Sequence, residues 1–329
     1  MKTIVSLLIV MALVCVMIGC APRPTEIRDW YDLNAVRNDL AASYVLMNDL
    51  DSTSPGYVEL ASEAANDGRG WEPIGTSDNG FTGTFNGQGH EVRDLFINRP
   101  DQDYVGLFGH ITWVRYIDNV GVVENVGIAQ ADVTGSTLVG ALVGHNAGIV
   151  DNSYSNGSVS GGERVGGLVG WNQATLSDSY SSCSVKGSTR VGGLTGDNWY
   201  YRGIVNNSYS TGSVTGSTRV GGLVGINYYG SVTDSYSSGS VAGSADVGGL
   251  VGYNTATVTN SFWDIQTSGQ ATSDGGTGKT TTEMKSIATF SAAGWNTVTV
   301  ANPNTRDPDY IWNIVEGATY PFLSWQPIS

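Results

Sequence analysis

The sequence of 329 residues is poor in charge, histidine and cysteine: 14% of its residues are charged, and it has three His and three Cys. Acidic residues outnumber basic ones by 30 to 16, which gives a formal net charge of −14. No basic cluster offsets this charge, and a chain with this balance repels nucleic-acid phosphates. We therefore expect no nucleic-acid partner.

The three cysteines do not form a disulfide framework. Cys15 and Cys20 belong to an apolar N-terminal segment, and Cys183 stands alone in the rest of the chain. A single cysteine has no intramolecular partner. We expect Cys183 to be a small, inert residue whose thiol takes no part in chemistry.

The N-terminus has the pattern of an export signal. Lys2 precedes an apolar run over residues 4–18, which is too short for the ~20 residues of a membrane-spanning helix but suits a secretory signal. The sequence Met-Ile-Gly-Cys at residues 17–20 resembles a bacterial lipobox. The resemblance implies cleavage after residue 19 and a lipid on Cys20, hence an exported lipoprotein anchored in the membrane at the cell surface or outer envelope. Ordinary secretion is the alternative.

Glycine is abundant, with 45 residues, and it disfavours helices by about 1 kcal/mol per residue relative to Ala. An internal repeat accounts for much of it. The block Val-Gly-Gly-Leu-Val-Gly, followed by one variable residue and Asn, occurs in five near-complete copies at intervals of 26 to 29 residues. The copies begin at Val139, Val165, Val191, Val220 and Val247, and a shorter version begins at Val105. A fixed period of this length indicates a solenoid.

We predict an all-β chain that forms a parallel β-solenoid (β-helix) of about six coils. Stacked units place Leu on Leu and Val on Val about 4.8 Å apart. Glycine is expected at the corners, because it accepts the positive φ that sharp corners require. The Asn that closes each block is expected to form a structural ladder whose amides satisfy backbone groups at a turn. The ladder comprises Asn146, Asn172, Asn198, Asn227 and Asn254.

These repeats resemble the GLUG repeat family, named for its Gly-Leu-Val-Gly signature, over most of residues 105–262. The flanking segments at residues 71–97 and 310–325 are similar to the leader and the ending of that family. Its members are bacterial and archaeal surface proteins, including large adhesins and the non-catalytic regions of some peptidases. The resemblance implies a β-solenoid at the cell surface, and it implies no single biochemical activity.

Capping regions are expected at both ends, because a solenoid exposes strand edges there. The predicted segments are a signal peptide at 1–19, the lipidated Cys with a linker at 20–28, an N-terminal capping region at 29–104, the GLUG-repeat solenoid at 105–264 and a C-terminal capping region at 265–329. Apolar spacing predicts a helix from about Asp29 to Ala41. Gly-Lys at 278–279 lacks the glycine spacing of a phosphate loop, whereas Thr280 and Glu283 fit a capping box that starts a short helix.

No motif of an enzyme is complete in this sequence. His90-Glu91 lacks the second His of a zinc-peptidase helix, and Gly157–Gly161 lacks the central Ser of a nucleophile elbow. Asp178 and Asp234 share one position of the repeat, but two units of stacking separate them by roughly 9–10 Å, so they are no obvious acid/base pair. We expect a non-enzymatic protein without cofactor or metal. A polysaccharide-active lyase or glycosidase and a purely structural envelope component are the alternatives.

A variable, aromatic-rich column is the candidate binding site. Core positions should be uniform in type, so we expect these residues to face outward along one edge, where aromatic rings stack on sugars or anchor protein partners. The column comprises His145, Trp171, Trp199, Tyr200, Tyr201, Tyr228, Tyr229 and Tyr253. Shielding of the coil's corner is the alternative role. The more regular column that begins at Tyr154 is expected to pack within the fold. The predicted function is adhesin-like binding of a glycan or a surface protein.

Overall fold

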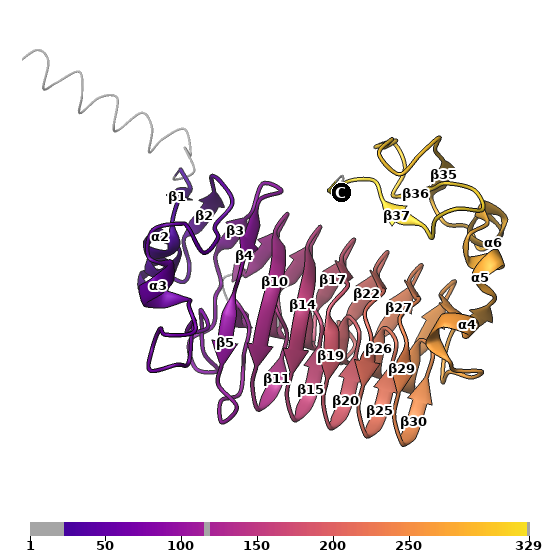
Figure 1. Ribbon diagram of the computed structural model, residues 1–329, viewed down its shortest axis with the longest axis horizontal. Helices are drawn as coiled ribbons and strands as arrows, with labels where there is room; N and C mark the ends of the chain where they lie inside the picture. The colour runs from indigo at the N-terminus through magenta and orange to yellow at the C-terminus, as the bar shows by residue number, and fades with distance from the viewer. Residues whose placement is uncertain (1–22, 115–118, 328–329) are drawn as a thin grey trace, which may run out of the picture.

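The computed structural model describes residues 23–114 and 119–327. The predicted signal peptide and the lipidation site Cys20 lie outside these residues. The chain winds into stacked turns, and their strands form four parallel sheets that run along one axis. The predicted β-solenoid is thus confirmed (Figure 1). Short strands follow one another around each turn, and each strand pairs with its equivalent in the next repeat.

The four sheets differ in length. Sheet A has nine strands: β1 (Thr25–Ile27), β2 (Ser43–Leu46), β3 (Thr84–Asn86), β9 (Val122–Glu124), β13 (Ile149–Asp151), β17 (Thr175–Ser177), β22 (Ile204–Asn206), β27 (Ser231–Thr233) and β32 (Thr257–Thr259). Sheet B has twelve: β4 (Glu91–Arg93), β5 (Phe96–Asn98), β10 (Gly127–Thr134), β14 (Tyr154–Ser160), β18 (Tyr180–Ser181), β19 (Ser184–Lys186), β23 (Tyr209–Ser210), β24 (Val214–Thr215), β28 (Tyr236–Ser237), β29 (Val241–Ala242), β33 (Phe262–Asp264) and β34 (Thr277–Lys279).

Sheets C and D carry the repeated glycine block. Sheet C consists of β6 (Phe108–Ile111), β12 (Val143–Asn146), β16 (Val169–Asn172), β21 (Thr195–Trp199), β26 (Val224–Tyr228) and β31 (Val251–Asn254). Sheet D consists of β11 (Thr137–Val139), β15 (Glu163–Gly166), β20 (Thr189–Gly192), β25 (Thr218–Gly221) and β30 (Ala245–Gly248). Five turns therefore have strands in all four sheets. The turn before them reaches sheet D only through a bridge between Val105 and Val139, which is why the coil is shorter than the six turns expected.

Glycine lets sheets C and D touch backbone to backbone. A Cβ added to Gly170 would lie 2.5 Å from the backbone N of Val139, and one on Gly196 would lie 2.6 Å from that of Val165. Both distances are shorter than a non-bonded contact allows, so no side chain fits between the two sheets at these glycines. The repeated block thus encodes this close approach.

Positive φ angles at the corners belong mainly to other residues, which corrects the expectation that glycine would adopt them. At the corner between sheets A and B, an Asn or Asp has φ between 45° and 48° in each of five turns. These residues are Asn152, Asp178, Asn207, Asp234 and Asn260. Asn and Asp tolerate this conformation because their short polar side chains bond locally. The backbone conformation therefore explains why this position is always Asn or Asp in these five turns.

The N-terminal region contributes strands to the coil in addition to covering its end. Strands β1, β2 and β3 continue sheet A in parallel register up to β9. Helix α2 (Trp30–Ala35) begins after Asp29, whose side chain accepts from Asp32 N, and continues as the 3-10 turn η1 (Val36–Asn38). The helix is thus shorter than predicted. A second short helix, α3 (Tyr57–Leu60), packs beside α2.

The C-terminal region covers the end of the coil and then one side of it. Helices α4 (Ile265–Ser268), α5 (Thr281–Met284) and α6 (Ile287–Ala292) follow the last turn, and the predicted Thr280–Glu283 capping box is present. Residues 295–327, here called the C-terminal strap, then run back over the rod (Figure 1). The strap contains the small sheet β35 (Thr297–Thr299), β36 (Trp312–Ile314) and β37 (Phe322–Leu323).

The remaining strands are β7 (Trp113–Val114) and β8 (Asn119–Val120), which pair antiparallel with each other. The interior of the coil is filled by stacked Val and Leu, such as Leu168 and Leu194, which are fully buried. No helix within the described ranges has both the length and the apolar character of a membrane span.

Candidate functional site

The variable column predicted to face outward runs along sheet C. In register along this sheet stand His110, His145, Trp171, Asp197, Ile226 and Tyr253. Arginines of sheet D lie over several of the rings: Arg164 is 5.3 Å from the Trp171 ring and Arg219 is 5.2 Å from the Tyr253 ring. The column is therefore largely covered by side chains of the neighbouring sheet.

His145 is buried, which contradicts the expectation that it lies on an exposed edge. Its ring is stacked between His110, at 4.5 Å, and Trp171, at 4.4 Å. Its Nε2 lies 2.9 Å from Gln173 Oε1. Burial, with a smaller contribution from His110, lowers the pKa of His145 to about 3. The imidazole is thus neutral at physiological pH and contributes packing.

Asp197 is a fully buried carboxylate in the same column. It lies 2.9 Å from Arg164 Nε and 3.3 Å from Arg190 Nη1. Burial raises the pKa of Asp197 to about 6, against the opposite effect of the two arginines. Its Oδ1 has no hydrogen-bond partner among the described residues. The cluster joins sheets C and D, and its complete burial gives a ligand no access.

The five asparagines of the predicted ladder form a continuous column inside the corner between sheets C and A. The Nδ2 of each of the first four lies 2.8–2.9 Å from the Oδ1 of the next asparagine. The amides also bond the backbone, as Asn198 Nδ2 does with Gly203 O at 3.1 Å. Asn146, Asn172, Asn198 and Asn227 are fully buried. The column therefore holds consecutive turns together.

Exposed aromatic rings gather where one repeat is longer than the others. Tyr200 and Tyr201 lie in the insertion after β21, and Tyr229 follows β26; their exposed fractions are 53%, 77% and 51%. The Tyr201 ring lies 5.2 Å from Tyr200 and 5.7 Å from Tyr229. These three residues, here called the loop tyrosines, are the most exposed part of the predicted aromatic edge.

Two further aromatic residues form the base of the loop tyrosines. Trp199 and Tyr228 are register partners at the ends of β21 and β26, and their rings stack at 4.2 Å. Both are half-buried, as are Trp171 and Tyr253. Of the predicted aromatic edge, the structure thus brings Trp199, Tyr228 and the loop tyrosines together. It leaves His145 buried and Trp171 and Tyr253 under arginine side chains.

A groove of about 610 Å³ lies beside the loop tyrosines, at the corner between sheets C and A. Tyr201 and Ile204 line one part of it, and Gln173 and Thr175 line another. The groove offers an aromatic ring together with amide and hydroxyl groups. This combination suits a sugar, which has apolar C–H faces and a hydroxyl rim.

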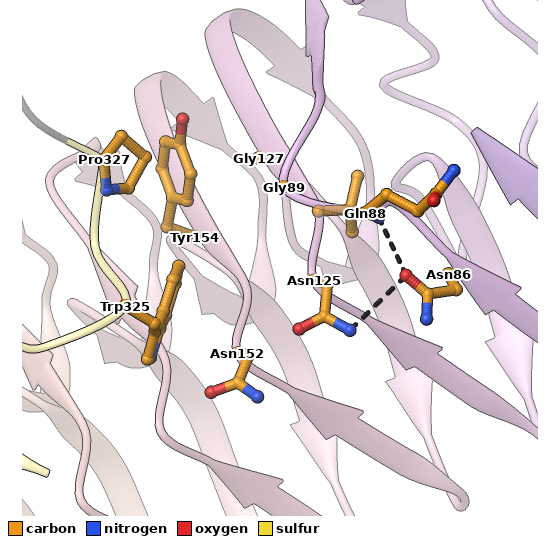
Figure 2. A pocket seen from close by; sticks show the side chains of 10 residues that line it. Asn86, Gln88, Gly89, Asn125, Gly127, Asn152, Tyr154, Trp325 and Pro327 are labelled. Carbon is orange, nitrogen blue, oxygen red and sulfur yellow. Dashed lines mark hydrogen bonds between the residues drawn. The ribbon is translucent and has the colours of Figure 1, made fainter. Parts of the chain in front are cut away.

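A second cleft, of about 570 Å³, lies under the end of the C-terminal strap, and sequence reasoning did not find it. Figure 2 shows Tyr154 and Trp325 on one side of this strap cleft and Gln88 and Asn125 on the other. Trp325 reaches the site through the strap, whereas Asn125 comes from the corner after β9. No repeat signature links these residues, so only the fold brings them together.

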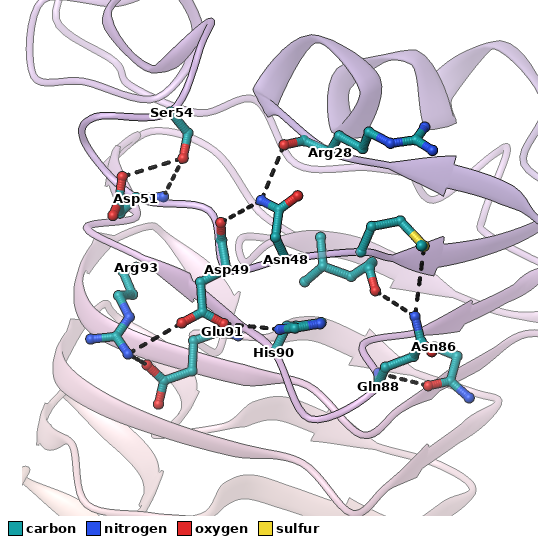
Figure 3. Close-up of polar contacts among 12 residues, drawn as sticks. Arg28, Asn48, Asp49, Asp51, Ser54, Asn86, Gln88, His90, Glu91 and Arg93 are labelled. Atoms are coloured by element: carbon teal, nitrogen blue, oxygen red, sulfur yellow. Dashed lines mark hydrogen bonds and ion pairs between the residues drawn. The ribbon is translucent and has the colours of Figure 1, made fainter.

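Polar contacts anchor the turn that carries one wall of the strap cleft (Figure 3). Asp49 accepts a hydrogen bond from Glu91 N at 3.1 Å, and its carboxylate lies 3.2 Å from His90 Nδ1 and 3.4 Å from Arg93 Nη2. Gln88 Nε2 donates to Leu46 O at 2.8 Å. His90 is thus paired with a carboxylate, and the part of the chain that the structure describes contains no group of His, Cys, Asp and Glu arranged to hold a metal.

The regular tyrosine column packs against the C-terminal strap. Tyr154, Tyr180, Tyr209 and Tyr236 stack at 4.8–4.9 Å on the outer face of sheet B and are almost completely buried. Tyr209 donates to Gln326 Oε1 and Tyr236 to Pro321 O, both at 2.7 Å. These residues, here called the buried tyrosine row, fix the strap to the coil.

Comparisons with known proteins agree with this architecture. The family model of the GLUG motif matches residues 135–160 and 216–242, which are two of the repeats. Halomucin of Haloquadratum walsbyi is 36% identical over 146 residues, which are 43% of this chain and 2% of halomucin. A protein of Evansella cellulosilytica, described as a candidate Gly-rich membrane protein, is 37% identical over 139 residues, 41% of this chain and 14% of that protein. The chain thus spans a small part of the length of these relatives.

A solved structure has the same overall fold. It is the crystal structure of a Bacteroides ovatus protein described as a candidate immunoglobulin A1 protease, with a TM-score of 0.63 and 19% identity. The match covers 93% of each chain. At this identity the likeness extends to the fold and not to the chemistry.

Proposed function

We propose that this chain is a non-enzymatic, adhesin-like protein of the cell surface that binds glycans through the loop tyrosines. The observation that carries the proposal is the group of three adjacent tyrosines exposed by half or more beside an open groove. Large exposed aromatic groups are unusual on monomeric proteins and mark interaction sites. The rings lie in the loops that follow β21 and β26, beside the stacked rings of Trp199 and Tyr228 at the ends of these strands.

Two observations support a location at the cell surface. The matched relatives are named as a halomucin and as a candidate membrane protein. The lipobox-like segment provides an anchor at Cys20, and only four residues separate this cysteine from β1 at Thr25. Because an extended chain spans at most about 3.6 Å per residue, an anchored coil would stand close to the membrane with its N-terminal end. Replacing Cys20 by Ala should then move the protein from the membrane fraction to the soluble fraction.

The glycan-binding test compares two sets of exposed tyrosines. The loop variant Tyr200→Ala/Tyr201→Ala/Tyr229→Ala should lose at least tenfold in affinity for the polysaccharides that the unchanged protein retains on a panel of immobilised polymers. The control Tyr31→Ala/Tyr310→Ala removes tyrosines that are 51% and 38% exposed elsewhere on the surface. It should bind within twofold of the unchanged protein.

Three outcomes would contradict the proposal. Equal binding by the loop variant would show that the loop tyrosines are not the site. Selective capture of a protein instead of a glycan would assign them to a protein partner, the other common use of exposed rings. Release of soluble sugar from any polymer on the panel would show that the chain is an enzyme.

A further inference from the structure

The strap cleft lies where the buried tyrosine row ends. Within the row, each ring is stacked on the ring of the next turn, and Tyr154 stacks on Tyr180 at 4.9 Å. On its other side, the register partner of Tyr154 is Gly127, which has no side chain. The row therefore stops at Tyr154, and the space beyond it, under Trp325, stays open as a cleft.

Amide side chains line the cleft opposite the rings. Asn86, Asn125 and Asn152 are half-buried, and Gln88 is exposed. Their hydrogen-bonding capacity is only partly used. Within the described part of the chain, the Asn125 side chain bonds Asn86, from Nδ2 to Oδ1 at 3.4 Å. A primary amide can make four hydrogen bonds, two as donor and two as acceptor. The cleft thus offers both donors and acceptors to a ligand.

Carboxylates outnumber guanidinium groups around the cleft. Glu91, Glu124 and Asp151 stand against Arg93, which pairs with Glu91, and Arg306, which donates to Pro327 O. Asn86 Nδ2 donates to Glu124 Oε1 at 2.8 Å, and Asn152 Nδ2 donates to Asp151 Oδ2 at 3.0 Å. The Tyr154 hydroxyl donates to the Glu91 carboxylate. Carboxylates behind the amides repel an anionic ligand, and the net charge of −14 acts in the same direction. A neutral ligand rich in hydroxyl groups is repelled neither by these carboxylates nor by the net charge.

We infer that the strap cleft is a second saccharide-binding site, specific for neutral sugars. One sugar ring would pack against Trp325, while its hydroxyls bond the amides of Asn125, Asn152 and Gln88. The volume of about 570 Å³ lies within the range of ligand pockets. The inference relies on the proposed function for the class of ligand, but it concerns different residues on a different corner of the coil.

The test measures the binding of short neutral oligosaccharides to the whole protein by titration calorimetry. The probes are cellohexaose, mannohexaose and N-acetylchitohexaose, and hexagalacturonate serves as an acidic counterpart. We expect at least one neutral probe to bind with a dissociation constant below about 1 mM and hexagalacturonate to bind at least tenfold more weakly. Failure of all neutral probes, or equal binding of the acidic one, would overturn the inference.

Two variants locate the binding. Asn125→Gly removes an amide at a φ of 55° that glycine accepts, and it should weaken binding at least tenfold. The matched control Asn260→Gly removes an asparagine at a φ of 48° on the last turn, outside the cleft, and should leave the affinity within twofold. Trp325→Ala should also weaken binding at least tenfold, whereas Trp325→Phe retains a ring and most of the affinity. Unchanged affinity in Asn125→Gly and Trp325→Ala would overturn the inference.

The loop variant separates this inference from the proposed function. We expect the part of the short-probe binding that Asn125→Gly and Trp325→Ala weaken to persist in the loop variant. The loop tyrosines lie at the corner between sheets C and A, whereas the cleft lies at the corner between sheets A and B. Loss of short-probe binding in the loop variant alone would overturn the inference and support the proposed site. Loss in Asn125→Gly alone, with unchanged polymer binding in the loop variant, would support the strap cleft and contradict the proposed site.

Discussion

Asn172 Nδ2 donates a hydrogen bond to Asn198 Oδ1 at 2.8 Å, and this bond joins two consecutive turns of the coil. Asn172 also contacts Ala174 O within its own turn and Ile204 O in the next, both at 3.0 Å. One side chain thus connects two turns and satisfies backbone carbonyls at a buried corner. Because an unpaired buried polar group costs about 1–3 kcal/mol, the asparagine column contributes to stability mainly by avoiding this cost.

The first prediction concerns the position of an asparagine within the ladder. Asn198→Ala should lower the free energy of unfolding by several kcal/mol, because it leaves Asn172 and the carbonyl groups of Gly203 and Ser231 with fewer partners in a buried site. Asn254→Ala at the end of the column should cost about 1 kcal/mol, since water reaches this half-buried residue. Urea denaturation followed by circular dichroism gives both values. Equal losses would contradict a cooperative ladder.

The repeated features of the fold were predictable from the sequence. Because each unit must present the same edge to the next, residues that stack recur at one period, and the Val, Leu and Asn columns were recognised for this reason. The block glycines were recognised as structural, but their role was misassigned. A glycine repeated at one position indicates that a larger residue does not fit there. The sequence does not show whether the reason is a positive φ or a close backbone contact, such as that between Gly170 and Val139.

Features that depend on one turn or on distant segments were not predictable. His145 is covered by Tyr104 and by Trp171, which lie 41 residues before and 26 residues after it. The strap cleft combines the corner residue Asn125 with Trp325, 200 residues away in the chain. Nothing in the repeat specifies where the C-terminal strap lies, because the strap has no repeated sequence.

The second prediction concerns Asp178 and pH. Burial, together with the charge of Asp151, raises the pKa of Asp178 from its ordinary value of 3.8 to about 6. The folded chain therefore binds more protons than the unfolded chain between about pH 4 and pH 6. Stability contributed by the protonated carboxyl is fully present below about pH 4, is lost as the pH rises to about 6 and stays constant above it.

Asp178→Asn removes this dependence and introduces the residue found at the same corner in three other turns, where it accepts the positive φ. After allowance for the partial exposure of the carboxyl, we expect a gain of about 1 kcal/mol at pH 7 and none at pH 4. Thermal unfolding at the two pH values measures the difference. An equal gain at both would show that the carboxyl of Asp178 titrates normally.

The third prediction concerns the contact between sheets C and D. Gly170→Ala should prevent the folding of the coil or destabilise it by more than 4 kcal/mol, because the new Cβ would lie 2.5 Å from Val139 N, and backbone cannot move aside locally. The control Gly162→Ala places its Cβ 3.0 Å from Ser136 O, where a small shift relieves the contact, and should cost about 1 kcal/mol. Expression yield and denaturation midpoints compare the two. Equal destabilisation of the two variants would show that backbone contact is not the reason for the glycine at this position of the repeat.

The last prediction concerns the C-terminal strap as a unit that opens separately from the coil. Trp312 is fully buried, with its ring 6.0 Å from Tyr209, 5.9 Å from Tyr236 and 4.7 Å from Trp295. Trp312→Ala should cost about 3–5 kcal/mol, as large cavities do. The coil keeps its own core, so we expect the loss to appear as local opening of the strap. Limited proteolysis should then cut within residues 295–327 and leave the repeats intact, while far-ultraviolet circular dichroism changes little. Simultaneous cleavage of repeats and strap would show instead that the buried tyrosine row is required for the coil itself.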